Sequence, residues 1–298
     1  MGGWNDILKE VQETQSQYDY VRRKYLKGLS EFTGRNVIAY YSSWLNKHGV
    51  NGLDINDSDM TGFMNCIHEM DCSKGLDLIL HTPGGDPAAA EAIVHYIRDK
   101  FNKDIRVIVP QLAMSAGTMI ACSAKEILMG KESSLGPIDP QFNGIPAYNI
   151  KMEFEEAKKD LLENPQNAQY WAIKLQQYPA AFMKQAIDAI ELSGTLVREW
   201  LGSCMFDGSD PDKKEAIDTI VGKLNEHDTS KIHGRHLSAD YCTGMGLKIL
   251  MIEDDDRLQD SILSLHHAYM ITLDALPVIK IIESQNGKSM ISSMQSAR

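Results

Sequence analysis

The stretch Leu76-Asp77-Leu78-Ile79-Leu80-His81-Thr82-Pro83-Gly84-Gly85-Asp86-Pro87 decides the fold class. Its first six residues are mostly apolar and predict a buried strand, and the segment 82–85 predicts a tight turn. Asp86 suits a helix N-cap, and Pro87 suits the first position of a helix. The stretch therefore predicts a strand that turns directly into a helix.

The same alternation of strand and helix continues on both sides. Strands are expected at 37–41, 105–109, 127–129, 247–251 and 278–282, and helices at 115–124 and 257–273. This order indicates βαβ units and a mainly parallel sheet, and so an α/β fold. Residues 1–34 are interpreted as a peripheral N-terminal helical arm and 35–298 as one domain. That domain contains a helical region at 150–232, with helices at 154–162, 170–201 and 213–224, and the tail after Gly287 is expected to be loose.

The composition limits the classes of function. The 298 residues carry a net charge of −11, which disfavours nucleic acid and anionic membrane surfaces as partners. No apolar run approaches the roughly 20 residues that span a bilayer, and no basic segment precedes an apolar one at the N-terminus. The five cysteines form no CxxC pair. We therefore expect a cytoplasmic protein without a membrane span, a bound metal or a cofactor.

Two features with chemical potential follow strands of the predicted sheet. Gly84 and Gly85 lack Cβ atoms, so the backbone can approach a substrate closely and point an N–H outward. Ser115 opens a helix of small residues, where free N–H groups and a partial positive charge suit an oxyanion. We expect the N–H groups of Gly85 and Ala116 to converge on one carbonyl oxygen, with the Ser115 hydroxyl placed to attack its carbon.

Three segments of the chain carry a resemblance to a known family. The segments are Leu78-Ile79-Leu80-His81-Thr82-Pro83-Gly84-Gly85, Ala113-Met114-Ser115-Ala116-Gly117-Thr118-Met119-Ile120-Ala121 and Leu135-Gly136-Pro137-Ile138-Asp139-Pro140-Gln141. Together they resemble the serine dehydrogenase proteinase family, a branch of the Clp/crotonase superfamily related to signal peptide peptidase A. The resemblance implies a Clp/crotonase-like fold of ββα repeats, and a serine peptidase with Ser115 as nucleophile and Gly85 and Ala116 as oxyanion donors. It also implies a peptide or protein substrate that contacts Gly84 and Gly136, and a homo-oligomer.

The general base departs from the Clp pattern. Asp139 stands near the place where Clp proteases have their triad histidine, and Gly234, beside His233, stands near that of their aspartate. Relatives of signal peptide peptidase A use a lysine some 40 to 50 residues after the serine, and Lys158 lies 43 residues after Ser115. Helical spacing places Lys158 on the apolar face of its helix, where burial favours a neutral amine. Lys158 is the predicted base; Lys159, Lys151, Lys174, Lys131, His233 and Asp139 remain open as alternatives.

Two other functions fit the same fold. A crotonase-like enzyme would use the oxyanion donors to polarise an acyl-CoA thioester, although no basic cluster for the CoA phosphates is evident. A catalytically inactive scaffold would use its long helices for assembly. The serine peptidase is the prediction that best uses Ser115 and the double glycine together.

Overall fold

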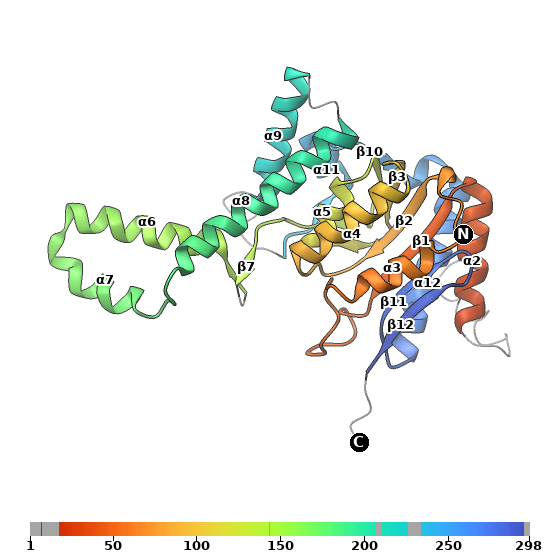
Figure 1. Ribbon diagram of the computed structural model, residues 1–298, viewed down its shortest axis with the longest axis horizontal. Coiled ribbons are helices and arrows are strands. Elements are labelled where there is room, and N and C mark those ends of the chain that lie inside the picture. The colour runs from red at the N-terminus through yellow and green to blue at the C-terminus, as the bar shows by residue number, and fades with distance from the viewer. Residues whose placement is uncertain (1–6, 8–17, 143, 207–209, 226–233, 295–298) are drawn as a thin grey trace.

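The computed structural model describes residue 7 and residues 18–142, 144–206, 210–225 and 234–294 (Figure 1). Its centre is a seven-stranded sheet in the order β10-β5-β3-β2-β1-β11-β12. The first five of these strands run parallel, while β11 and β12 are antiparallel. The strands are β1 (Asn36–Ser42), β2 (Leu76–His81), β3 (Ile105–Val109), β5 (Glu126–Met129), β10 (Ile249–Met251), β11 (Val278–Ser284) and β12 (Ser289–Ser293). This mainly parallel sheet confirms the predicted α/β class.

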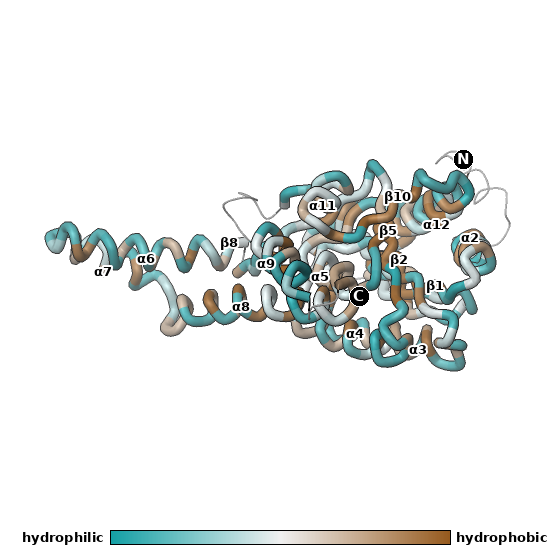
Figure 2. The backbone as a smooth tube through the Cα atoms, turned by 90° about the horizontal axis from the view of Figure 1, so that it is seen from above, coloured by the Kyte–Doolittle hydropathy of each residue, from teal (hydrophilic) through white to brown (hydrophobic). Residues whose placement is uncertain are grey.

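Both faces of the sheet are buried, which explains why its strands read as continuous apolar runs. In β2, Leu78 and Leu80 point into one core, while Ile79 points into a second core on the other face. Figure 2 shows the hydrophobic segments concentrated on these central strands. The first face is covered by α3 (Asp59–Ile67), α4 (Pro87–Lys100), α5 (Ala116–Cys122), α9 (Pro211–Asn225) and α11 (Ala239–Met245), and the second by α2 (Tyr18–Thr33) and α12 (Asp256–Ala275).

The turn after β2 forms as its sequence predicts. The Asp86 side chain accepts a hydrogen bond from the Ala88 N–H at 2.9 Å, and Pro87 occupies the first turn of α4. Proline costs nothing there because that N–H has no partner within a helix. The predicted strand-turn-helix unit is therefore confirmed.

Helices α6 (Ala147–Glu163), α7 (Ala168–Leu175) and the first half of α8 (Phe182–Trp200) project from the body as a hairpin, which we call the helical arm (Figure 1). The second half of α8 returns to the core through Val197 and Trp200. The expectation of one helix over 170–201 is wrong, because residues 176–181 form a turn. Pro179 lies in that turn and cannot donate a helical hydrogen bond.

Two further expectations need correction. The described part of the N-terminal helix is not peripheral, because Leu26 and Leu29 are fully buried against β1 and α12. Residues 1–6 and 8–17 of the segment predicted as an N-terminal arm lie outside the described residues. The tail is not loose at Ser289–Ser293, where β12 pairs with β11. A seven-residue β11 offers an edge whose free N–H and C=O groups favour another strand. The division into residues 1–34 and 35–298 stays a prediction.

Candidate active site

Ser115 lies at the N-cap of α5 in a backbone conformation that serine rarely adopts. Its φ is 51° and its ψ is −116°, and its side chain makes no capping hydrogen bond. In the described part of the chain, no partner of the Ser115 hydroxyl is found. Positive φ in a residue with a Cβ costs free energy and is found preferentially at functional sites. The turn thus presents a half-buried hydroxyl instead of using it to cap the helix.

The double-glycine bend runs directly beside this turn. Thr82 donates its N–H to the Leu112 carbonyl, and its own carbonyl accepts from the Met114 N–H, each at 3.0 Å. Two residues later Gly84 meets the serine: a Cβ built on Gly84 would lie 2.7 Å from Ser115 Cβ and 3.0 Å from Ala116 N. Only glycine permits this approach, and it has φ 99°.

Two backbone donors beside the serine carry no acceptor among the residues that the structure describes: the N–H of Gly85 and the N–H of Ala116. Ala116 is the first residue of α5, so its N–H has no partner within the helix. The Gly84 carbonyl accepts from the Ile55 N–H at 2.8 Å. Because the C=O and N–H of a trans peptide point in opposite directions, the Gly85 N–H points away from Ile55. Both N–H groups can therefore donate hydrogen bonds to a developing oxyanion.

Ile55 does not stand out in the sequence, yet it is part of this site. Its backbone forms a parallel bridge with Gly85, and a Cβ on Gly85 would lie 2.4 Å from Ile55 N. No local pattern signals this contact, because about 30 residues separate the two partners. The nearest signal is the pair of adjacent glycines, which indicates that something approaches the backbone closely.

A small sheet brings two further segments to the serine. It consists of β4 (Leu112–Ala113), β6 (Ser134–Leu135) and β9 (Leu237–Ser238), with β4 and β6 parallel and β9 antiparallel. The residues after β4, those after β6 and those before β9 therefore leave the sheet at the same end. This arrangement places the Ser115 turn, Gly136 and residues 234–236 side by side.

The residues after β6 are held in place by polar contacts. Gly136 donates its N–H to the Thr118 hydroxyl at 2.9 Å, and a Cβ on Gly136 would lie 3.2 Å from the Met114 Cα. Asp139 is buried and accepts a hydrogen bond from the Gln141 side chain at 2.9 Å. His236 is exposed, and His233 lies outside the described residues. Gly136 thus lies next to the residue that precedes Ser115.

The structure does not place Lys158 as its sequence pattern predicts. Its side chain is exposed on α6 in the helical arm, and the buried residues of α6 are Ala147, Ile150 and Ala157. Helix α8 decides which face is buried, because the apolar cluster of the arm forms between α6 and α8. No contact joins Lys158 to Ser115 in the described part of the chain. Among the alternatives, Lys159 and Lys131 are exposed and Lys174 is paired with Glu153 at 2.5 Å, while Lys151 is half-buried.

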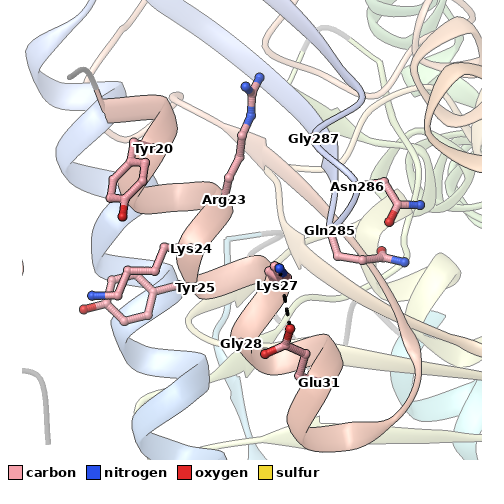
Figure 3. A pocket seen from close by; sticks show the side chains of 10 residues that line it. All are labelled: Tyr20, Arg23, Lys24, Tyr25, Lys27, Gly28, Glu31, Gln285, Asn286 and Gly287. Atoms are coloured by element: carbon pink, nitrogen blue, oxygen red, sulfur yellow. Dashed lines mark ion pairs between the residues drawn. The ribbon is translucent and has the colours of Figure 1, made fainter.

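A cavity of about 870 Å³ lies away from this site, between α2 and the turn that joins β11 to β12 (Figure 3). Arg23 and Lys27 contribute much of its charge, but Arg23 is paired with Glu283 at 2.8 Å and Lys27 with Glu31 at 3.7 Å. Helix α2 covers the opposite face of the sheet from α5. The cavity therefore lies on the other side of the sheet from Ser115.

Helices long and apolar enough to cross a bilayer do not occur in the described parts of the chain.

Among curated proteins, the chain is similar to two from Methanocaldococcus jannaschii. It is 39% identical over 158 residues to the uncharacterized protein MJ0137, and this match covers 52% of this chain and 54% of the relative. It is 45% identical over 75 residues to the uncharacterized protein MJ1495, which covers 25% of each chain. The match thus spans about half the length of the first relative and a quarter of the second.

Among solved structures, the chain resembles a mutant of the membrane-bound stomatin-specific protease 1510-N. The TM-score is 0.39 with 19% sequence identity, over 70% of this chain and 79% of that protein. The family of ClpP-like SDH-type serine proteinases matches residues 10–166, which contain β1 to β5, the double-glycine bend and Ser115. Because this match extends over more than half of the chain, the protein belongs to the ClpP-like SDH-type serine proteinase family.

Proposed function

We propose that this protein is a serine peptidase in which the Ser115 hydroxyl attacks the carbonyl carbon of a peptide bond. One observation carries the proposal: Ser115 occupies a strained turn against Gly84, and its hydroxyl has no partner among the described residues. The free N–H groups of Gly85 and Ala116 support the companion assignment of an oxyanion hole. Gly84 and Gly136, which border the serine, are the proposed contacts of the substrate backbone.

The reaction proceeds through an acyl-enzyme. A base takes the hydroxyl proton as the Ser115 oxygen bonds to the carbonyl carbon, and the Gly85 and Ala116 N–H groups stabilise the resulting oxyanion. The C–N bond then breaks, and the amine leaves with the proton that the base holds. A water molecule hydrolyses the ester by the same steps and frees the serine.

Two assignments of the base follow from different features. Lys158 remains our proposed base from its spacing, and because it is exposed on the helical arm, it would have to reach the serine of a second copy of the chain. The small sheet supports a histidine instead, because residues 234–236, which include His236 and directly follow His233, enter β9 at the end where β4 leads into Ser115. In this assignment Asp139 is the carboxylate that would favour the protonated imidazole during proton transfer.

The nucleophile is tested with a fluorophosphonate probe and a peptide library. We expect the wild type and the control variant to be labelled and to cleave peptides, and Ser115→Ala to do neither. Ser123→Ala is a matched control, because Ser123 is buried at the other end of α5. Equal labelling of Ser115→Ala and wild type would refute the assignment.

The base is tested by the rate of labelling against pH. Lys158→Ala and Lys159→Ala are compared with His233→Ala and His236→Ala. A general base contributes roughly 10²- to 10⁴-fold to the rate. The variant that lacks the base should therefore be labelled slower by that factor, and its labelling rate should no longer show the pH dependence that the base causes. If only a histidine variant does so, Lys158 is excluded. In a lysine mechanism, mixing Lys158→Ala with Ser115→Ala should restore activity, because the two copies complement each other.

Assembly and location are part of the same proposal. The helical arm exposes several large apolar side chains, including Leu162 (78% exposed), Tyr170 and Ile173. Such side chains favour contact with another copy of the chain. The five cysteines are free thiols, which supports a reducing cytoplasm. Light scattering should show a homo-oligomer for the wild type. The double variant Leu162→Asp/Ile173→Asp should shift the molar mass towards that of the monomer.

A further inference from the structure

A buried ion pair lies behind the double-glycine bend. Lys280 on β11 and Asp59 at the start of α3 are both almost inaccessible, and the Lys280 Nζ donates to the Asp59 carboxylate at 2.8 and 3.0 Å. Tyr40 on β1 donates its hydroxyl to the same carboxylate at 2.8 Å. An ion pair without solvent persists only when further hydrogen bonds satisfy its polar atoms. The remaining hydrogen bonds of Lys280 and Asp59 show which segment of the backbone the ion pair fixes.

Those remaining bonds all go to the loop that precedes α3. The third donor of Lys280 reaches the Asp54 carbonyl at 2.7 Å, and Asp59 accepts from the Asn56 N–H at 3.1 Å. Ile55 lies between these two contacts, so the ion pair fixes the backbone on both sides of it. The loop is therefore tied to the centre of the sheet rather than to the surface.

Ile55 passes this constraint to the proposed oxyanion donor. Its N–H binds the Gly84 carbonyl at 2.8 Å, and its carbonyl accepts from the Asp86 N–H at 2.9 Å. These two bonds flank Gly85 and fix the plane of the peptide that carries the Gly85 N–H. Glycine alone does not fix that plane, because a residue without a Cβ can adopt many backbone conformations. Gly84 and Gly85 have φ values of 99° and 151°, which residues with a Cβ rarely adopt.

We propose that Asp59 and Lys280 are positioning residues for the oxyanion hole, acting through Ile55 on the Gly85 N–H. This inference rests on the proposed serine peptidase function. The ion pair touches neither the substrate nor Ser115. Its effect is to keep the Gly84–Gly85 peptide from rotating its N–H away from the site, so it should influence turnover more than ground-state binding of substrate.

The experiment compares two ion pairs that attach to the same strand. The test variant Asp59→Asn/Lys280→Met removes both charges and leaves no unpaired one. The control variant Arg22→Met/Glu283→Gln removes the equally buried Arg22–Glu283 pair, which joins β11 to α2 at 3.0 Å, together with the outer contacts of Glu283 to Arg23 and of Arg22 to Asp19. Both variants lose a buried pair on β11, but only the first loses the link to Ile55. Tyr40→Phe is a milder variant that keeps both charges.

The first measurement is steady-state peptide hydrolysis at a temperature where all variants are folded. We expect kcat of the test variant to fall by roughly 10- to 100-fold, with KM within about threefold of wild type, because a misplaced donor loses most of its effect. Tyr40→Phe should lose a smaller factor in kcat, and the control should stay within about threefold. Equal losses of kcat in the test and control variants would overturn the inference.

The second measurement does not need activity. Amide hydrogen exchange measures the protection of the Asp86 and Ile55 N–H groups, which donate the two hydrogen bonds that flank Gly85. We expect both to lose protection in the test variant and to keep it in the control. Retained protection in the test variant would overturn the inference. If the wild type neither cleaves peptides nor labels at Ser115, the proposed function fails, and the exchange experiment still decides whether the ion pair holds the bend.

Discussion

Gly84 lies directly against Ser115, so closely that a Cβ on Gly84 would come within 2.7 Å of the serine Cβ. The contact joins the turn after β2 to the turn before α5, the two features on which the proposed site is built. It is possible because the backbone of Gly84 has φ 99°, a value that side chains other than hydrogen disfavour. The contact also provides the first test of the site.

We expect Gly84→Ala to destabilise the fold and to reduce labelling of Ser115. The new methyl group meets the Met114 carbonyl and Ser115, and alanine is strained at this φ, for a combined cost of about 2–4 kcal/mol. Gly34→Ala is the matched control, since Gly34 has φ 68° but no atom within 4 Å of a built Cβ. Urea unfolding and probe labelling measure both effects. The contact matters little if the two variants behave alike.

Ser115 should show the opposite relation between stability and activity. Its φ of 51° is unfavourable for serine but not for glycine, so Ser115→Gly should raise the free energy of unfolding by about 1–2 kcal/mol while abolishing labelling. Ser115→Ala removes the same hydroxyl but keeps the strained Cβ, and should leave stability near wild type. A glycine variant no more stable than the alanine variant would show that the turn stores no strain.

Local signals in the sequence predict the elements that carry this site. The apolar run of β2, the Asp86 cap and Pro87 act within a few residues of one another, so the strand-turn-helix unit follows from sequence alone. The place of Ser115 at the head of α5 follows from the same kind of signal. These features depend on backbone preferences that neighbours in the chain determine.

Contacts between distant segments could not be predicted. Strand β12 forms because β11 offers it an edge, and Ile55 finds Gly85 only after the sheet is assembled. Lys158 illustrates the limit of periodicity: the pattern of α6 shows an apolar face, but the position of α8 decides which residues that face buries. Each of these outcomes depends on tertiary packing, which overrides a local pattern.

Thr118 should couple the segment at Gly136 to the segment before Ser115. Its buried hydroxyl donates to the Ala113 carbonyl and accepts from the Gly136 N–H, each at 2.9 Å. Thr118→Val keeps the shape but leaves a buried N–H unsatisfied, so we expect a loss of about 2–3 kcal/mol in stability and slower labelling. Thr243→Val is the control, because among the described residues the Thr243 hydroxyl bonds only to the Ala239 carbonyl within α11. Thermal unfolding of both variants decides whether this bridge stabilises the site.

Two buried histidines, His81 and His266, lie beneath the site. His81 ends β2, and its ring lies edge-on to that of His266 on α12, with 5.4 Å between ring centroids. Tyr41 approaches His266 Nδ1 with its hydroxyl at 3.2 Å. Burial, and then the neighbouring His267, lowers the pKa of His266 to about 3. Burial, and then His266, also lowers the pKa of His81 well below its usual 6.5. Both rings are therefore neutral in the folded protein.

Acid should destabilise the protein through these two groups. In the unfolded chain both histidines bind protons below about pH 6.5, whereas in the folded chain His266 stays neutral until about pH 3. The unfolded state thus binds more protons between pH 6.5 and 3, and stability falls as the pH falls through this window. Each pH unit costs about 1.4 kcal/mol for each such histidine. His266→Gln should therefore lose about 2 kcal/mol less than wild type between pH 7 and pH 5 in urea unfolding. His48→Gln, an exposed site, should lose as much as wild type. Identical pH dependence in wild type and His266→Gln would mean that His266 takes up its proton without unfolding.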